Sequence, residues 1–236
     1  SWAYAPARAA PLPTALPAGA HPSAPQSCVA CHLSSGEGLA GVPNLAGLSA
    51  DYIAEQVHEF RDGRRLSSQP GRLATAIMIE AARKVSDPDL ARAAAYFAAL
   101  PRRPWVRVVE TATVLGVRPE PLGNRIVEVP EHMAGSGNPG VVAYVPLGAV
   151  ARGEALVRTG GHGSEPCASC HAADLRGLGD TPPLAGRSPS YLARMLWDLK
   201  TGARHGPAVA QMQGPAAALN DTDITDVAAY LASLKP

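Results

Sequence analysis

Aromatic side chains are scarce in this sequence. They make up 5% of its 236 residues and include only two phenylalanines. The hydrophobic content, at 46%, is nevertheless that of an ordinary globular protein. A chain of this length forms one large domain or two small ones, and two small cores would have few large side chains to fill them. An additional apolar group in each core would supply the missing bulk.

The chain also lacks a strong charge of either sign. Its 21 Lys and Arg against 20 Asp and Glu give a net charge of +1, which excludes a strongly basic nucleic-acid-binding protein. No uninterrupted apolar run approaches the roughly 20 residues that span a bilayer. The sequence starts at Ser1 without an initiator methionine or a basic and apolar leader. We therefore expect a mature chain, soluble or peripherally membrane-associated, whose signal peptide has been removed.

Cysteine is rare as well, and all four cysteines lie in two copies of one motif. The copies are Cys28-Val29-Ala30-Cys31-His32 and Cys167-Ala168-Ser169-Cys170-His171. Two cysteine pairs can also form a zinc site, a thioredoxin-like redox motif or disulfides. The zinc interpretation leaves both histidines without a purpose, and no βαβ pattern supports the redox interpretation.

Cys-x-x-Cys-His is the attachment signature of c-type haem, because two thiols one helical turn apart add to the porphyrin while the next imidazole reaches the iron. The sequence therefore predicts two covalently bound haem c groups as cofactors, with iron as the metal. Two buried porphyrins would also fill the cores that aromatic residues leave thin. Because bacteria attach haem c outside the cytoplasm, we expect a periplasmic protein.

The two motifs begin a longer internal repeat. Pro43-Asn44-Leu45-Ala46-Gly47 and Pro182-Pro183-Leu184-Ala185-Gly186 lie 139 residues apart, as do the two histidines of the motifs and the pair Tyr52 and Tyr191. Further on the spacing falls to 134 residues, for Met78 with Met212 and for Tyr96 with Tyr230. The loss of five residues fits a surface loop, where a change of length costs little.

The repeat predicts three parts of the chain. Residues 1–103 form a first domain with a proline-rich N-terminal arm over residues 1–27, residues 104–149 form a linker, and residues 150–236 form a second domain. Amphipathic helices are expected after residues 52 and 191, ending at Gly63 and Gly202, and after the capping residues Ser86 and Asn220. In the linker, residues 105–109 and 125–129 alternate as strands do, and residues 135–140 read as a flexible loop.

The candidate iron ligands follow from the motifs. His32 and His171 are the proximal ligands, and the carbonyls of Pro43 and Pro182 are candidates to accept a hydrogen bond from the second nitrogen of each ring. A methionine thioether as the opposite ligand raises the reduction potential and closes the iron to other molecules. Met78 and Met212 hold equivalent positions in the repeat and are the predicted ligands, whereas Met195 reads as core and Met133, beside His132, is the reserve.

Two further groups of side chains have weaker patterns. Arg64, Arg65, Arg72 and Arg204 are candidates to pair with haem propionates, and ordinary loop charges are the alternative. The histidines outside the two motifs have no repeat partners and read as surface residues.

Together, the two Cys-x-x-Cys-His motifs, the Pro-x-Leu-Ala-Gly loops, the downstream methionines and the final helices containing Ala-Tyr resemble the tandem class I dihaem cytochromes c, similar to cytochrome c4. The resemblance covers roughly residues 26–101 and 150–236. It implies an all-α fold of two cytochrome c domains, here joined by a long, partly extended linker. It implies a carrier of single electrons without catalytic activity, which exchanges them with redox proteins and has no nucleic-acid partner. A periplasmic dehydrogenase or a membrane quinol-oxidising complex would be the donor, and a terminal oxidase or small cytochrome the acceptor.

The sequence departs from that pattern in two places. A proline-rich arm stands where the first domain usually has an N-terminal helix, and the linker is longer than in cytochrome c4. Residues 120–130 resemble dihaem subunits that accept electrons from periplasmic dehydrogenases, so a fixed subunit of such a complex is one alternative. A dihaem peroxidase with an open or bis-histidine haem is another. A cysteine-ligated catalytic haem is excluded, because haem attachment uses every cysteine.

Overall fold

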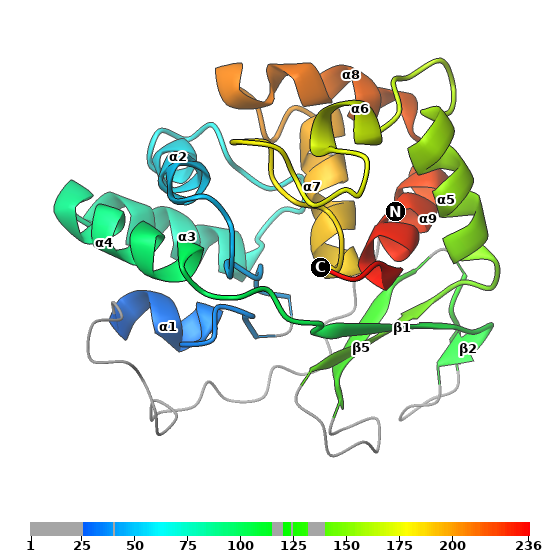
Figure 1. The fold of residues 1–236 in the computed structure, drawn as a ribbon, viewed down its shortest axis with the longest axis horizontal. Coiled ribbons are helices and arrows are strands. Elements are labelled where there is room, and N and C mark those ends of the chain that lie inside the picture. The colour runs from blue at the N-terminus through cyan, green and yellow to red at the C-terminus, as the bar shows by residue number, and fades with distance from the viewer. Residues whose placement is uncertain (1–25, 40, 115–119, 124, 132–139) are drawn as a thin grey trace.

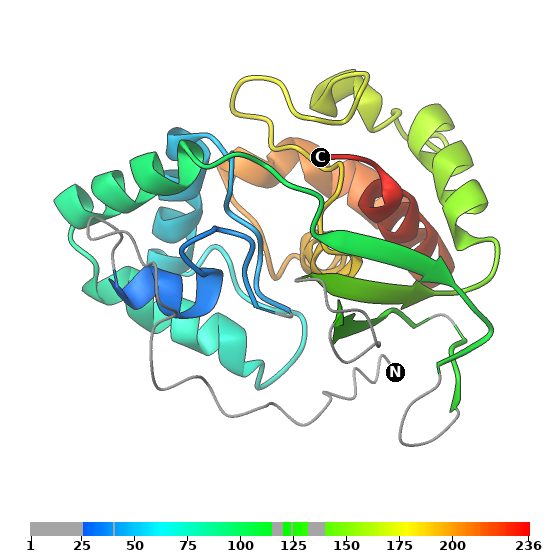
Figure 2. The same ribbon diagram turned by 60° about the horizontal axis from the view of Figure 1, so that its bottom comes forward.

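Two groups of helices lie side by side with a small sheet against them (Figures 1 and 2). The computed structural model describes residues 26–39, 41–114, 120–123, 125–131 and 140–236. Most of the predicted N-terminal arm, the predicted loop at 135–140 apart from Gly140, and Met133 with His132 lie outside these residues. None of the described helices combines the length and the apolarity that crossing a membrane requires.

The first group contains four helices, each set by local sequence signals. They are α1 (Gln26–His32), α2 (Ala50–Arg61), α3 (Leu73–Lys84) and α4 (Asp87–Ala98). The Ser49 hydroxyl caps α2 by accepting the Tyr52 N–H at 3.1 Å, and the Ser86 hydroxyl caps α4 in the same way. Their core is small and is built around Phe97, which is 1% exposed.

The second group repeats this pattern with one more helix in front. It contains α5 (Ala149–Thr159), α6 (Ala168–His171), α7 (Pro189–Lys200), α8 (Ala210–Ala218), which follows a 3₁₀ turn at Pro207–Val209, and α9 (Asp221–Ser233). Asn220 and Asp223 form the complete capping box that the sequence predicted for α9. Helix α5 packs across α9, and its Arg152 forms an ion pair with the buried Asp226 at 2.7 Å.

The connecting segment is a sheet. Strands β1 (Val106–Glu110), β5 (Val141–Val145) and β4 (Val127–Pro130) lie in the order β1-β5-β4, and β2 (Thr113–Val114) pairs with β3 (Glu120–Pro121) separately. Strands β1 and β5 are parallel, with Val106 opposite Val141, while β4 is antiparallel to β5. The sequence predicted β1 and β4, but β5 was read only as the approach to α5.

Strand β5 escaped prediction because it is covered on both faces. Val141, Val142, Ala143 and Val145 are all buried, so the strand reads as a continuous apolar run without alternation. Ile126 and Val145 join the core of the second helical group, together with residues of α5, α7 and α9. The sheet is therefore an extension of the second core, and the connection is an ordered part of the fold.

Gly153 on α5 permits the closest helix contact in the molecule. A Cβ atom at this position would lie 1.9 Å from the carbonyl oxygen of Asp226 on α9. We expect Gly153→Ala to force the helices apart and to lower the free energy of unfolding by about 1–3 kcal/mol, the usual cost of overpacking. Gly214→Ala on α8 is the matched control, because a Cβ there meets nothing within 4 Å. Denaturant unfolding of both variants checks this, and equal stabilities would contradict it.

Candidate functional site

Each predicted proximal histidine is buried and held by a proline carbonyl. His32, at the end of α1, is 5% exposed, and its Nδ1–H donates to the Pro43 carbonyl at 2.9 Å. His171, at the end of α6, is also 5% exposed and donates to the Pro182 carbonyl at 2.8 Å. A ring fixed through Nδ1 presents Nε2 as a lone-pair donor, which is the arrangement of a metal-binding histidine.

The loop after each histidine has the same backbone geometry in both copies. Leu33 and Ala172, the residues next to the histidines, have φ angles of 61° and 67°. The histidine carbonyl then accepts the N–H of Gly38 in one copy and of Gly177 in the other, both at 3.0 Å. Both glycines have positive φ, and a Cβ on Gly177 would lie 2.6 Å from the Thr181 carbonyl. The loop needs glycine here to bring the proline carbonyl back to the imidazole.

Burial also sets the protonation of the two imidazoles. Desolvation lowers the pKa of His32 and of His171, and the hydrogen bond to the proline carbonyl opposes this only in part. A lowered pKa favours the neutral imidazole at neutral pH. The neutral ring is the form that binds a metal ion.

The cysteines are arranged for attachment to a group outside the chain. None of the four is in a disulfide. Cys28 and Cys31 lie on α1, whereas Cys167 and Cys170 lie at and on α6 in the other helical group (Figure 1), so the two pairs do not converge as a shared zinc site requires. Within the described ranges, no three His, Cys, Asp or Glu side chains cluster to hold a metal ion. Burial raises the pKa of Cys167, whereas the side chain of Cys170 is exposed.

The structure places the predicted methionines on helices. Met78 lies in the middle of α3 and is half-buried, and that helix exposes Leu73 and Ile77 by 71% and 44%. Met212 lies on α8, also half-buried, and packs against Leu199, Val209 and Ala216. The reserve candidate, Met133, lies outside the described residues. The assignment of Met78 and Met212 as iron ligands stays a prediction.

A polar cluster fills the junction between the two helical groups. Its members are three pairs that stand 139 residues apart: Tyr52 and Tyr191, Gln56 and Met195, Arg65 and Arg204. Gln56 Oε1 accepts from Arg65 Nη1 at 2.9 Å and from Arg204 Nη2 at 2.8 Å. Sequence analysis named the two arginines only among four candidates, and it read Met195 as core. The repeat spacing contains the signal that groups all six.

The buried arginines lack a carboxylate partner. Arg65 and Arg204 are 5% and 6% exposed, and the Nε of each is buried without a hydrogen-bond partner in the described part of the chain. Nη2 of Arg187, which is 6% exposed, is in the same position, and burial lowers the pKa of Arg187 to about 10. Guanidinium groups buried this deeply are normally paired. They fit a cofactor that brings its own carboxylates, as haem does.

The other two candidate arginines have partners of their own. Arg64 Nε pairs with Glu59 Oε1 at 2.8 Å, and Arg72 Nη1 donates to Gln69 at 3.3 Å. Their geometry matches the alternative reading as loop charges.

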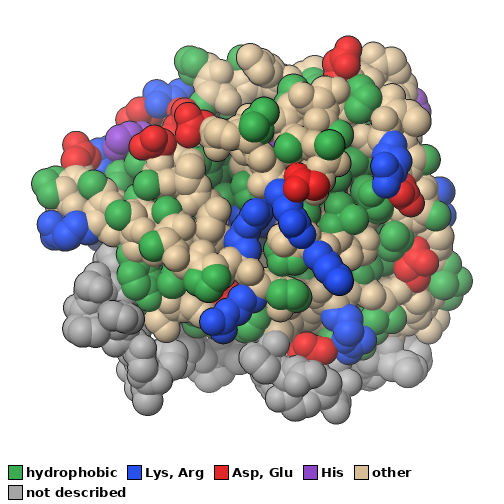
Figure 3. Space-filling view, in the orientation of Figure 1, with side chains coloured by type: hydrophobic (Ala, Val, Ile, Leu, Met, Phe, Trp, Pro, Cys, Tyr) green, Lys and Arg blue, Asp and Glu red, His purple; other side chains and the backbone are tan. Residues whose placement is uncertain are grey.

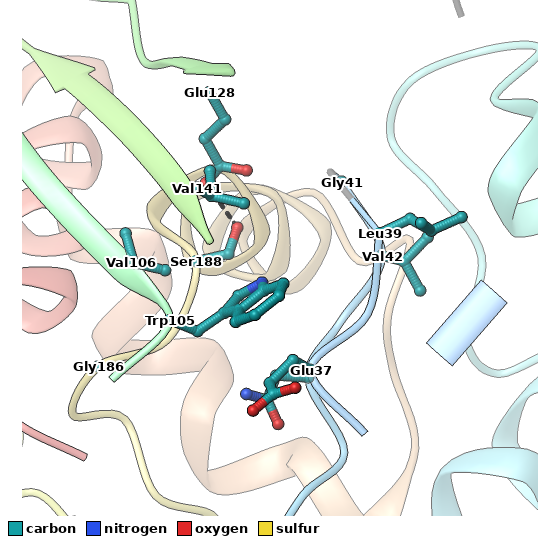
Figure 4. A pocket seen from close by; sticks show the side chains of 11 residues that line it. Glu37, Leu39, Gly41, Val42, Trp105, Val106, Glu128, Val141, Gly186 and Ser188 are labelled. Atoms are coloured by element: carbon teal, nitrogen blue, oxygen red, sulfur yellow. Dashed lines mark hydrogen bonds between the residues drawn. The ribbon is translucent and has the colours of Figure 1, made fainter. Parts of the chain in front are cut away.

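A small pocket lies where the sheet meets both helical groups. Trp105, at the start of β1, lies between the strands and the loop that carries Glu37, Leu39 and Val42 (Figure 4). On the other side of the pocket, the Ser188 hydroxyl donates to Glu128 at 2.6 Å. The pocket encloses about 10 Å³. This is the space of about one water molecule, so the contact is a packed joint and no porphyrin site.

Comparisons with known proteins define the class. The family model for cytochrome c matches residues 22–101 and 150–235, more than half of the chain. The chain is 29% identical over 213 residues to cytochrome c4 of Pseudomonas aeruginosa, covering 88% of this chain and 83% of that protein. It is also 29% identical over 239 residues to the thiosulfate dehydrogenase electron acceptor of Thiomonas intermedia, covering 99% and 82%.

Two solved structures are similar in fold. Thiosulfate dehydrogenase TsdBA from Marichromatium purpuratum superimposes with a TM-score of 0.64 at 29% identity, over 89% of this chain and 36% of that longer one. Cytochrome c4 of Acidithiobacillus ferrooxidans gives 0.60 at 24% identity, over 89% and 99%.

The chain belongs to the cytochrome c family. It has two cytochrome c domains and carries two covalently attached haem c groups. The protein is a dihaem electron-transfer cytochrome. When bound, each haem supplies an iron that changes its charge by one electron. The largely helical two-domain fold expected from the sequence is confirmed, with the sheet as a minor addition.

The histidine loop of the second site offers a direct test of the site geometry. Gly177→Ala would place a Cβ 2.6 Å from the Thr181 carbonyl at a φ of 87°. We expect it to displace the Pro182 carbonyl and to lower the free energy of unfolding by about 2–4 kcal/mol, from a left-handed backbone penalty of about 1–2 kcal/mol plus the steric clash.

Gly179→Ala in the same loop is the control. Gly179 also has a positive φ, but a Cβ there meets nothing within 4 Å, so only the backbone penalty remains. Denaturant unfolding measures both variants, and a pyridine haemochrome assay counts the attached haems. A Gly177→Ala protein as stable as Gly179→Ala would contradict the proposed role of the loop.

Proposed function

We propose that this protein relays single electrons between redox proteins of the bacterial periplasm through two haems, each with histidine and methionine as axial ligands. Cys28 and Cys31 hold the first haem, and Cys167 and Cys170 hold the second. The axial ligands are His32 with Met78 and His171 with Met212, and Pro43 and Pro182 orient the imidazoles. The duplicated bond from the imidazole Nδ1 to the proline carbonyl is the observation that supports this reading best.

The domain limits of this proposal follow the repeat. The first domain spans 1–103, the linker 104–149 and the second domain 150–236. The protein performs no catalysis, because a methionine ligand leaves neither iron open to a substrate. The peroxidase alternative requires one iron without methionine.

The first test concerns the methionines. In the ferric protein, each thioether ligand gives a sulfur-to-iron charge-transfer band. We expect Met78→Ala and Met212→Ala each to remove about half of that band, because each variant loses one of the two thioether–iron bonds. Met195→Ala is the control and should keep it in full. Absorbance spectroscopy makes the measurement.

Two results would contradict the assignment. A full band in either ligand variant would show that its methionine does not bind iron. Loss of half the band in Met133→Ala would transfer the ligand role in one domain to Met133.

We propose a dehydrogenase as the electron donor. The thiosulfate dehydrogenase electron acceptor of Thiomonas intermedia matches 99% of this chain, so the similarity includes the connecting sheet. A membrane quinol-oxidising complex is the alternative donor, and a terminal oxidase or small cytochrome is the acceptor in either case. The connecting sheet suits a fixed subunit of a dehydrogenase complex, which changes the partner's residence time and leaves the chemistry the same.

Basic side chains on one face favour a partner with an acidic surface. Lys and Arg side chains gather across the middle of the face in Figure 3. The two domains also bring arginines together at their seam, where half-buried Arg102 donates to the carbonyl of the exposed Arg176 at 3.4 Å. The proximity of Arg176 contributes to a lowered pKa of Arg102. Two like charges held this close attract an anionic surface.

The second test uses these charges. We expect Arg176→Glu to slow reduction by a thiosulfate dehydrogenase about tenfold at low salt and much less at high salt, because electrostatic steering is screened. Lys84→Glu, an exposed change of the same size on α3, is the control and should leave the rate unchanged. Stopped-flow absorbance follows haem reduction. Equal rates for Arg176→Glu and the parent protein would rule this surface out as the docking site of that donor.

A further inference from the structure

The junction cluster obeys a two-fold symmetry that one pair of side chains breaks. The backbones of the two domains pair there in equivalent ways. The Leu66 N–H donates to the Ala203 carbonyl and the His205 N–H to the Arg64 carbonyl, both at 2.9 Å. Arg65 and Arg204 face each other across this bridge. At the centre, however, Gln56 of the first domain stands opposite Met195 of the second.

Each arginine crosses from its own domain into the other. Arg65 Nη2 donates to the hydroxyl of Tyr191 at 3.2 Å, and Arg204 is hydrogen-bonded to Tyr52. The two guanidinium groups therefore belong to both domains at once. Their positions depend on which acceptors the junction offers on each side.

The acceptors on the two sides are unequal. Gln56 Oε1, on α2, accepts from both arginines at 2.9 and 2.8 Å. At the equivalent place on α7, the Met195 sulfur lies 3.4 Å from Arg65 Nη2 and 3.7 Å from Arg204 Nη1. An amide oxygen is a strong acceptor and a thioether sulfur is a weak one. Both guanidinium groups are thus anchored on the first domain, although one of them comes from the second.

The nearby acidic side chains do not cancel this difference. Glu59 and Asp198 are the equivalent pair, and each is 3% exposed. Glu59 Oε1 is engaged by Arg64 at 2.8 Å, and Asp198 Oδ1 accepts the Ser68 hydroxyl and N–H at 2.7 Å. The cluster is therefore left with two buried positive charges that lie closer to one domain.

We propose that the exchange of Gln56 for Met195 makes the two haems unequal, by biasing the buried charges of Arg65 and Arg204 toward the first domain and raising the reduction potential of the first haem relative to the second. A ferric haem carries one more positive charge than a ferrous haem, so a nearby cation disfavours the ferric form. Electrons then move downhill from the second domain to the first. This inference rests on the proposed function, because it requires a haem in each domain.

The test exchanges the two side chains. Met195→Gln gives the junction an amide on both sides, and Gln56→Met gives it a thioether on both sides. Each single variant removes the bias, and the double variant reverses it. We expect each single variant to change the ratio of the two haems' reduction equilibrium constants about threefold in favour of the second haem. The double variant should change it about tenfold, or 59 mV for one electron.

Optical redox titration measures the separation of the two waves, and NMR of the ferric haem methyl groups assigns each wave to a domain. Met195→Leu is the matched control and should leave the separation unchanged, because it removes only a weak acceptor. A pyridine haemochrome assay first counts the haems in every variant. Fewer than two haems in the parent protein would refute the proposed function. Two haems with the same separation in the parent, both single variants and the double variant would refute only this inference.

Discussion

The orientation of one imidazole ring, repeated in each domain, is the constraint on which both sites depend. Cysteines can attach a haem wherever two thiols lie a helical turn apart, but a working iron site needs the next histidine held at a fixed angle and in the neutral state. In this protein the proline carbonyl and the burial around it meet both needs. The glycines after each histidine exist to return that carbonyl. The surrounding helices keep the loop closed.

The sequence alone predicted what is local and repeated. The attachment motifs, the histidine loops, the capped final helices and the two-domain plan follow from residue spacing, because each depends on side chains close together in the chain. The junction cluster could not be found in this way, since Gln56 and Arg204 meet only after the domains dock. Met195 shows the limit most clearly. Its position on an amphipathic helix favoured the core, while its contacts lie with two arginines of different domains.

The connecting segment shows a different limit. Alternation of apolar and polar residues identified β1 and β4, which have one face partly open, but it is absent from β5, which is buried on both faces. Parallel pairing of β1 with β5 is also a non-local property that depends on the chain between them. The long connection of this protein is therefore a structural element of the second domain. It also carries Trp105 into contact with the histidine loop of the first domain.

The parallel pairing of β1 and β5 has a consequence for how this family member tolerates change. Val106 lies beside Val141, so the chain leaves for its excursion and re-enters the sheet at neighbouring points. Everything between Glu110 and Val141 starts and finishes on a scaffold whose ends are already fixed to each other. Insertions or deletions in that stretch leave the spacing of the two irons unchanged. Evolution, or a protein engineer, has there a place to fit the carrier to a new neighbour without retuning its wiring.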